Sequence, residues 1–348
     1  MLKDIHIQNY RGIKDLKIKD FKRINLLVGD NNSSKTSVLE AIFITANYDI
    51  SGVIAFEAFR ENGRLPVVPK NPQDPEVWEG FENLFYEKNI RDGFEIESTH
   101  DFAKIKLKAT AGSEVVRFEN SQISPAIINR NLVNNLTAKY TENDQNPATL
   151  GYSRDGNYCG FSNLCAPTLI YIISSVPAKP SELAPMMDKI AQSNDEGFLS
   201  DLAQKIDPTI KNIKSSGQRI LADIGKISID LKYCGEGLTS VLNILLRMRE
   251  VKNGILLIDE IENGLHWKTQ KVLWRAVIAA AKKNNVQIIA TTHSQEMIKA
   301  LSEVCEEDAS DIDGFSVFSL DKDGDKNYVN TYAGEDLKFR LNAGGEIR

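Results

Sequence analysis

The chain has 348 residues and a net charge of −6, with 42 lysines and arginines against 48 aspartates and glutamates. This mild acidity gives no support to a large nucleic-acid footprint, although it leaves room for a local basic patch. The length suffices for one large domain or two lobes with a sizeable core. The four cysteines form no C-x-x-C pair, which argues against a structural zinc site and a disulfide framework.

The N-terminal residues show no targeting segment. "MLKDIHIQNYRG" carries charges and no apolar core, so a signal peptide is not expected. The longest apolar runs, such as "APTLIYIISSVP", are too short to span a bilayer. We therefore expect a soluble, cytoplasmic protein with reduced thiols and no membrane partner.

The first half of the chain predicts mostly strands. Residues 1–28 alternate between apolar and polar in short runs, which predicts two or three strands, and residues 33–46 have the apolar spacing of a helix. Four prolines between 66 and 75 mark an extended connection. The following "EVWEGFENLFYEK" predicts a short amphipathic helix, and "DGFEIESTHDFAKIKLKATAGSEVVRFEN" predicts an antiparallel meander.

The second half predicts alternating strands and helices. Residues 120–165 are rich in Asn, Thr and Ser and indicate long loops or an extension of a sheet edge, whereas "TLIYIISS" predicts a buried strand. Residues 180–213 predict helices. From 227 onward, strands and helices alternate, which indicates a parallel α/β sheet. The last part predicts a hairpin with "KDGD" at its turn.

The first motif is a candidate phosphate loop, "GDNNSSKT", between a predicted strand and a predicted helix. It keeps Gly29, Lys35 and Thr36 of the G-x-x-x-x-G-K-[ST] pattern but has Ser34 in place of the second glycine. The backbone N–H groups of residues 31–35 are suited to ring a phosphate at the helix N-terminus. We expect Ser34 to adopt an ordinary φ at the helix start, where its hydroxyl can cap. A chance match in a Ser- and Asn-rich turn is the alternative.

Three further motifs follow in the C-terminal half. "ILLIDE" has the Walker B form, in which Asp259 is suited to the Mg²⁺ shell and Glu260 to orienting or deprotonating the attacking water. "VQIIATTHS" ends a predicted strand at His293. "YCGEGL" places Gly235 and Gly237 before a helix N-terminus, another anion-binding arrangement. Each motif also has a simpler explanation when taken singly: "ILLIDE" fits a strand that runs into an acidic turn, His293 fits a structural histidine, and "YCGEGL" fits a plain glycine turn.

Together, and in this order, the four motifs resemble the ATP-binding-cassette type of head found in SMC, RecF and OLD-family proteins. "IQNYRGIKDLKI" is similar to the opening of those heads. "GEGLTSVLNILL", "GILLIDEIENGLH", "VQIIATTHSQEMI" and the terminal "GEIR" look like AAA-type ATPases related to the OLD ATPase and to the ATPases of anti-phage defence pairs. The signature departs from the usual Leu-Ser-Gly-Gly form, with Cys234 near the position of the serine.

This resemblance implies the fold and its organisation. We expect an α/β ABC-type P-loop ATPase head with a mixed sheet, an antiparallel β subdomain and a helical insertion. It forms a single domain over 1–348, with an N-terminal lobe at 1–165, the insertion at 178–215 and a C-terminal lobe at 216–348.

The resemblance also assigns roles to residues. ATP and Mg²⁺ are the expected cofactors, and His266, on the loop after Walker B, is expected either to act in trans or to be a surface histidine. The catalytic candidates are Lys35, Glu260 and His293, and the metal ligands are Thr36 and Asp259. The nucleotide-binding candidates are Arg11, Gly29, Asn31, Asn32, Ser33, Ser34, Lys35, Thr36, Ser37, Gly235, Glu236 and Gly237.

The implied mechanism is an isologous homodimer, or a higher oligomer, that closes around ATP. The chain is too short after His293 for the TOPRIM nuclease of OLD proteins, so the resemblance suggests a separately encoded nuclease or toxin as effector in antiviral defence. A RecF-like DNA-repair ATPase and a non-hydrolysing nucleotide-dependent scaffold are the alternatives. The first needs a basic surface, for which "KIKLKATAGSEVVR" is the candidate, and the second is favoured by Ser34.

Overall fold

The fold was analysed in a computed structural model of the chain. The structure describes residues 1–47, 83–89, 91–112, 135–143, 145–153, 159–161, 170–173, 178–191, 196–307, 314–343, 345 and 347.

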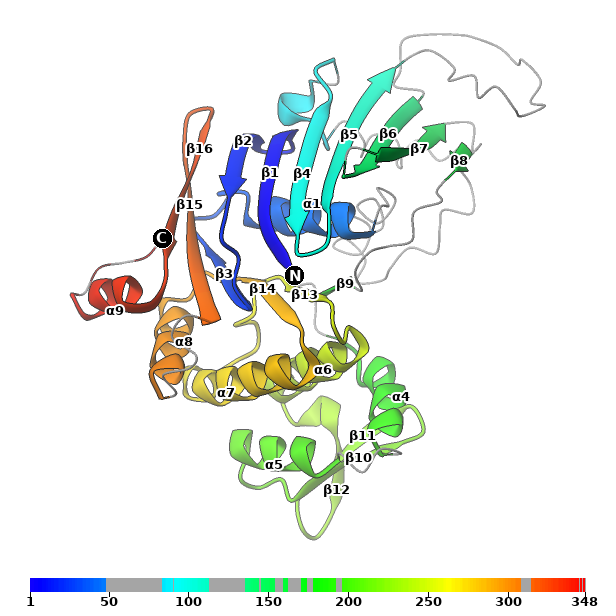
Figure 1. The fold of residues 1–348 in the computed structure, drawn as a ribbon. Helices are drawn as coiled ribbons and strands as arrows, with labels where there is room; N and C mark the ends of the chain where they lie inside the picture. The colour runs from blue at the N-terminus through cyan, green and yellow to red at the C-terminus, as the bar shows by residue number, and fades with distance from the viewer. Residues whose placement is uncertain are drawn as a thin grey trace.

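An antiparallel sheet forms one layer of the molecule, with strand order β2-β1-β4-β5-β6-β7-β8 (Figure 1). Its strands confirm the predicted opening strands and the meander, and they show that the Asn- and Thr-rich region extends the sheet edge. In β4, Phe94, Ile96 and Ser98 are buried while the residues between them are partly exposed, as expected for a sheet with one covered face. The strands are β1 (Leu2–Tyr10), β2 (Ile13–Ile18), β4 (Phe94–His100), β5 (Lys104–Gly112), β6 (Asn135–Glu142), β7 (Gln145–Ser153) and β8 (Cys159–Phe161).

A second, mixed sheet has the order β16-β15-β3-β14-β13-β9. Five of these strands run parallel, and only β16 is antiparallel to its neighbour. Chain order and spatial order differ, because β14 lies between β3 and β13 and pairs with both. The strands are β3 (Ile24–Val28), β9 (Ile170–Ile173), β13 (Ile255–Ile258), β14 (Gln287–Thr291), β15 (Phe315–Asp323) and β16 (Lys326–Tyr332).

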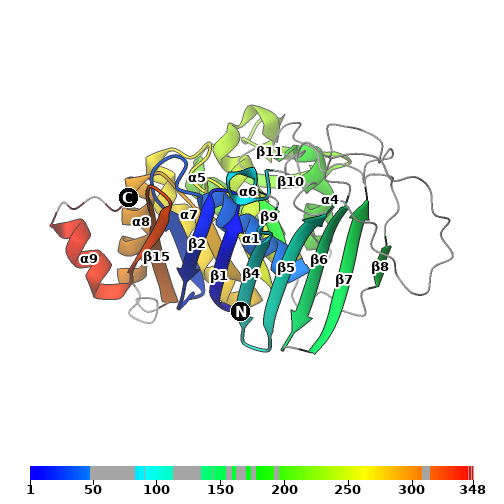
Figure 2. The same cartoon turned by 90° about the horizontal axis from the view of Figure 1, so that it is seen from above.

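Both faces of the mixed sheet are buried, each in its own hydrophobic core. Leu26, Leu256 and Ile288 point into a core shared with the helices on one face. Leu27 and Leu257 point the other way, into a core shared with helix α1 (Lys35–Asn47) and the antiparallel sheet. Helix α1 packs between the two sheets (Figures 1 and 2). This double burial explains why these strands are continuous apolar runs in the sequence.

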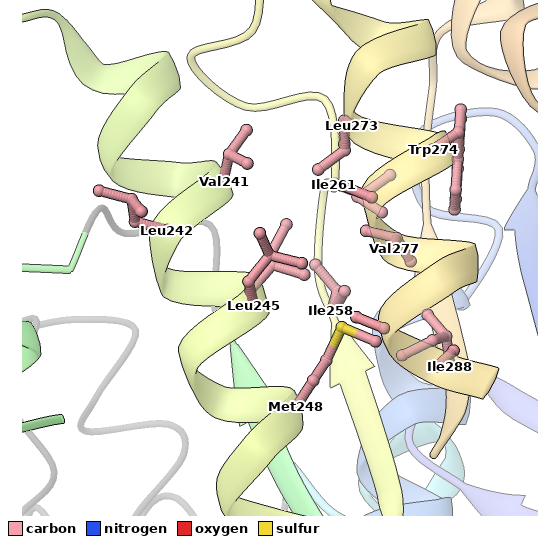
Figure 3. Close-up of a cluster of buried hydrophobic side chains, with 14 of the residues drawn as sticks. Val241, Leu242, Leu245, Met248, Ile258, Ile261, Leu273, Trp274, Val277 and Ile288 are labelled. Carbon is pink, nitrogen blue, oxygen red and sulfur yellow. The ribbon is translucent and has the colours of Figure 1, made fainter. Parts of the chain in front are cut away.

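Helices α6 (Glu236–Glu250), α7 (Trp267–Asn284) and α8 (Gln295–Glu307) cover the outer face of the mixed sheet. Val241 and Leu245 of α6 approach Leu273 and Val277 of α7 above Ile258 of β13 (Figure 3). The C-terminal helix α9 (Gly334–Asn342) follows the β15–β16 hairpin. No helix in the described ranges combines the length and the hydrophobicity needed to cross a bilayer.

The region after 178 contains more strand than the sequence indicates. Helices α4 (Pro180–Ala191) and α5 (Glu196–Ile206) are confirmed. They pack on a three-stranded antiparallel sheet formed by β10 (Asn212–Ser216), β11 (Arg219–Asp223) and β12 (Ser228–Asp230). The first strand of the alternation predicted from 227 onward is therefore the short β12, which lies in this small sheet and not in the parallel one.

The predicted amphipathic helix at 76–88 is wrong over the part that the structure describes. Phe85 bridges to Tyr10, and Tyr86–Lys88 form a single 3₁₀ turn in which Glu87 has a φ of 51°. The rings of Phe85 and Tyr10 belong to the core beneath the antiparallel sheet, so tertiary contacts override the helical spacing. Residues 76–82 lie outside the described residues.

Candidate functional site

The candidate phosphate loop connects β3 to α1, as the motif requires. Gly29 has a φ of 142°, and a Cβ there would lie 2.4 Å from the carbonyl oxygen of Leu320, so only glycine fits. Asn32 and Ser34 have positive φ values of 69° and 71°. The expectation of an ordinary φ for Ser34 is therefore wrong: the serine adopts the left-handed conformation that the consensus glycine favours.

Lys35 folds back onto its own loop. Its ammonium group donates to the carbonyl oxygens of Gly29 and Asp30 at 2.8 and 2.9 Å, and Ser33 Oγ lies at 3.3 Å. The side chain is only 6% exposed. Burial lowers the pKa of Lys35, while the carboxylate of Asp259 acts in the opposite direction. The lysine thus already occupies the interior of the loop that faces a phosphate in P-loop proteins.

A chain of hydrogen bonds joins the loop to the Walker B carboxylates. Thr36 Oγ1 lies 3.2 Å from Asp259 Oδ1, and the hydroxyl of Thr291 donates to the same oxygen at 2.7 Å. The N–H of Glu260 in turn donates to Thr291 Oγ1 at 2.8 Å, and Glu260 has a φ of 55°. Three strand ends therefore meet at one point, because β14 lies between β3 and β13.

His293 lies at the mouth of a cavity of about 200 Å³ beside the phosphate loop. The cavity is lined by loop residues including Asn31, by the segment after β14, by α8 and by Ile347. Gln295 fixes this last residue, since its Nε2 donates to the carbonyl oxygen of Ile347 at 2.6 Å. The ring of His293 is exposed, and its backbone N–H donates to Glu262 Oε1 at 2.7 Å.

Gly235 precedes α6, as predicted, whereas Gly237 is the second residue of that helix. Gly235 and Glu236 are exposed, and Gly235 has a φ of 88° with open space around it. Gly237 packs so closely against the loop after Walker B that a Cβ would lie 2.7 Å from the carbonyl oxygen of Gly264. Burial raises the pKa of the nearby Cys234 thiol, which does not favour a reactive thiolate.

Two further candidates have partners that differ from those expected. Arg11 pairs with the buried Glu40 of α1, with Nε 2.5 Å from Oε2, so it contacts the helix that follows the phosphate loop. His266 Nδ1 accepts the N–H of Lys268 at 3.3 Å and caps helix α7.

The structure thus brings Lys35, Thr36, Asp259 and Glu260 together, with His293 at the adjacent cavity. Sequence reasoning missed Thr291, Glu262 and Gln295. Thr291 and Thr292 are adjacent in the sequence, and no signal in it distinguishes their roles. Glu262 lies inside the quoted Walker B segment, where a third acidic residue was the available signal.

The donor atoms at this point fit a magnesium ion. The charges acting on Lys35 include the carboxylates of Asp259, Asp30, Glu262 and Glu260, so the site has an excess of negative charge. Magnesium prefers hydroxyl, carboxylate and phosphate oxygens and binds through one or two protein side chains. Among the residues that the structure describes, no group of three or more His, Cys, Asp or Glu is arranged to hold a metal ion.

Comparisons with known proteins agree with this geometry. Residues 1–150 and 167–298 match the AAA ATPase domain family. An ATP/GTP phosphatase of Helicobacter pylori is 25% identical over 97% of this chain and 97% of its own length.

Solved structures show the same fold at low sequence identity. An SMC head bound to the C-winged helix domain of ScpA aligns with a TM-score of 0.53 and 12% identity, over 96% of this chain and 98% of that one. An Smc head with an extended coiled coil, bound to the C-terminal domain of ScpA derived from Pyrococcus furiosus, aligns with a TM-score of 0.51 and 10% identity, over 98% of each chain.

The family match covers most of the chain, from β1 to the start of α8, and includes all four motifs. The predicted ABC-type α/β fold, the resemblance to SMC-like heads and the predicted ATP hydrolysis are confirmed. The chain belongs to the AAA ATPase domain family and is a P-loop ATPase with the fold of an SMC-like head.

Proposed function

We propose that this ATPase is a nucleotide-driven switch that closes as a homodimer around ATP and thereby controls a separately encoded effector, a nuclease or toxin, in bacterial anti-phage defence. The observation that carries the proposal is the hydrogen-bonded chain from Thr36 through Asp259 and Thr291 to Glu260. It couples the phosphate loop to the residues expected at the γ-phosphate, so nucleotide contacts and loop position change together.

Within one subunit, the loop and Lys35 bind the triphosphate. Lys35 exchanges its bonds to Gly29 and Asp30 for phosphate oxygens, while the backbone N–H groups at the start of α1 add their dipole. Thr36 and Asp259 would hold Mg²⁺, which neutralises phosphate charge when bound. Glu260, held in place by Thr291, accepts a proton from the attacking water or orients it, and His293 contacts the γ-phosphate.

The surface around the signature supports closure by a second copy. Tyr233 and Trp267 are 74% and 61% exposed, although most large apolar side chains in the described ranges are buried. They flank the α6 N-terminus and the loop after Walker B, which the contact between Gly237 and Gly264 joins into one surface. If the chain dimerises as the SMC heads that it resembles do, this surface faces the ATP bound to the partner subunit. Hydrolysis then removes the γ-phosphate that joins the two subunits.

An effector partner is supported by the fold comparison. Two heads of this fold were solved with a domain of ScpA bound, so a head of this shape is able to bind another protein. Helices α4 and α5 and their small sheet are the docking surface we favour for an effector, because they project from the ATPase core (Figure 1).

Direct action on DNA is less favoured. The candidate basic segment places Lys104 and Lys106 on β5, where they pair with Glu97 and Glu95 at 2.9 and 2.6 Å. Lysines that already pair with carboxylates release fewer counterions on binding DNA than the lysines of a uniformly positive surface do. Membership of an ATPase family likewise favours hydrolysis over a non-hydrolysing scaffold, despite Ser34.

The test is the solution mass of Glu260→Gln with and without ATP and Mg²⁺, measured by light scattering beside wild-type turnover. We expect the mass to double on ATP and turnover to occur only in the wild type. An unchanged mass with normal wild-type turnover would overturn the dimer switch while leaving the ATPase intact. Co-purification with the product of an adjacent gene then tests the effector.

A further inference from the structure

Glu262 is the acidic residue of the Walker B segment to which no function has been assigned. It follows β13 by four residues, on the loop that leads to Asn263 and His266. Its carboxylate reaches across to the segment after β14, where Oε1 accepts the N–H of His293 at 2.7 Å. A carboxylate bond to a backbone N–H is charge-assisted and stronger than a neutral hydrogen bond.

This bond continues a set of contacts between the two strand ends. The N–H of Ile261 donates to the carbonyl oxygen of Thr291 at 3.0 Å, and the N–H of Glu260 donates to the hydroxyl of Thr291. Further along both segments, the Glu262 side chain adds its bond to the N–H of His293. His293 has an exposed ring, so its backbone is the part that the fold holds.

The surroundings of Glu262 also indicate more than a surface role. Its Oε2 is buried and has no hydrogen-bond partner among the described residues. Its negative charge acts to raise the pKa of Lys35, against the larger effect of burial, so Glu262 lies near the phosphate loop. A buried carboxylate oxygen without a hydrogen-bond donor lowers the stability of the folded protein. Hydrophobic packing alone therefore does not explain a glutamate at this position.

The same residue also begins the loop that contacts α6. The carbonyl oxygen of Glu262 accepts the N–H of Leu265 at 2.9 Å, which shapes the turn containing Gly264. Gly264 packs against Gly237 at the start of α6. Glu262 therefore contacts the segment after β14 through its side chain, and its backbone shapes the turn that contacts α6.

We propose that Glu262 is a positioning residue for ATP hydrolysis: it fixes His293 beside the phosphate loop and links the position of that histidine to the turn at 263–266. The inference rests on the proposed role of His293 at the γ-phosphate. Glu262 does not exchange a proton with the substrate in this scheme, and Glu260 remains the group that acts on water.

The test compares Glu262→Ala with Glu262→Gln, which keeps an oxygen able to accept the His293 N–H. We expect Glu262→Ala to lower kcat about 100-fold, the effect of a displacement near 1 Å, with a KM within about threefold of wild type. Glu262→Gln should retain most of kcat and an unchanged pH–rate profile. Glu303→Ala, which removes a carboxylate of α8 that pairs with Lys271 of α7, is the matched control and should leave kcat and KM unchanged.

A second readout is independent of turnover. The chain has four histidines, so ring-labelled NMR spectra are simple enough to assign His293 by comparison with His293→Gln. We expect the His293 ring signals to move in Glu262→Ala and to stay in place in Glu262→Gln, without added nucleotide. Unchanged His293 signals and wild-type kcat in Glu262→Ala would overturn the proposal. So would a Glu262→Gln variant as inactive as Glu260→Gln, because Glu262 would then act as the base. The NMR comparison is made without nucleotide and therefore does not depend on dimerisation.

Discussion

The hydroxyl of Thr291 donates a hydrogen bond to the carboxylate of Asp259 at 2.7 Å. The same hydroxyl accepts a hydrogen bond from the N–H of Glu260, the residue that follows Asp259. Thr291→Val keeps the shape and removes both bonds, leaving the partly buried N–H of Glu260 without this acceptor and the carboxylate of Asp259 with one donor fewer. We expect a loss of about 1–3 kcal/mol in the free energy of unfolding and a lower kcat.

Urea unfolding and steady-state turnover measure the two effects. Thr291→Ser retains the hydroxyl and is the control, which should behave like wild type in both assays. Equal stability and turnover in the valine and serine variants would show that the hydroxyl does not hold Glu260.

The left-handed Ser34 predicts an unusual double-mutant result. Ser34→Gly relieves the positive φ and should raise the free energy of unfolding by about 1 kcal/mol. Gly12→Ala should destabilise the wild type, because its Cβ would lie 2.9 Å from Ser34 Oγ. In the Ser34→Gly background that clash is absent, so the cost of Gly12→Ala should largely vanish. Additive effects across the cycle of urea-unfolding measurements would argue against this contact.

The close approach of α6 to the loop after Walker B can be tested at Gly237. A Cβ there meets a backbone oxygen of Gly264, which a side-chain rotation cannot relieve, so Gly237→Ala should cost about 1–3 kcal/mol. Gly197→Ala is the control, because Gly197 in α5 has nothing within 4 Å and alanine favours helix. Thermal unfolding of both variants gives the comparison, and equal melting temperatures would refute the steric argument.

His100 predicts acid sensitivity of the antiparallel sheet. Burial, aided by the positive charge of the N-terminus, lowers the pKa of His100 from 6.5 to about 4. Between these values the unfolded chain binds a proton that the folded chain does not, so stability is lost as pH falls from about 6.5 towards 4. The loss from this residue is roughly 3 kcal/mol.

The measurement is the free energy of unfolding from urea titrations at pH 7 and pH 4.5, for wild type and His100→Leu. We expect the difference between the two pH values to be smaller in the variant. An identical pH dependence in both proteins would place the acid-sensitive group elsewhere.

The parts of the fold that the sequence predicts best are those with strong local patterns. The strands ending at Val28, Ile258 and Thr291 are apolar because both sheet faces are buried, and the phosphate loop and Walker B have fixed spacings. The small sheet β10–β12 was missed over β10 and β11, since these strands are short and "NIKSSGQRILAD" has weak alternation.

The rest depends on contacts between segments far apart in the chain. Gly12, in the turn between β1 and β2, leaves room for the hydroxyl of Ser34, since a Cβ there would lie 2.9 Å from Ser34 Oγ. The roles of Thr291 and Glu262 follow from the placement of β14 between β3 and β13, and chain order does not give that strand order. These are the positions at which the sequence alone left the site incomplete.

The central place of β14 also limits how this enzyme can move. The phosphate loop and Walker B cannot slide past one another without breaking the hydrogen-bond ladders on both edges of β14. Gln287, at the start of that strand, further locks it to the first strand of the chain, through bonds to both backbone groups of Leu2. Conformational changes driven by ATP hydrolysis must therefore occur in the loops of the catalytic centre and in the outer helices, while the strands of the sheet keep their positions.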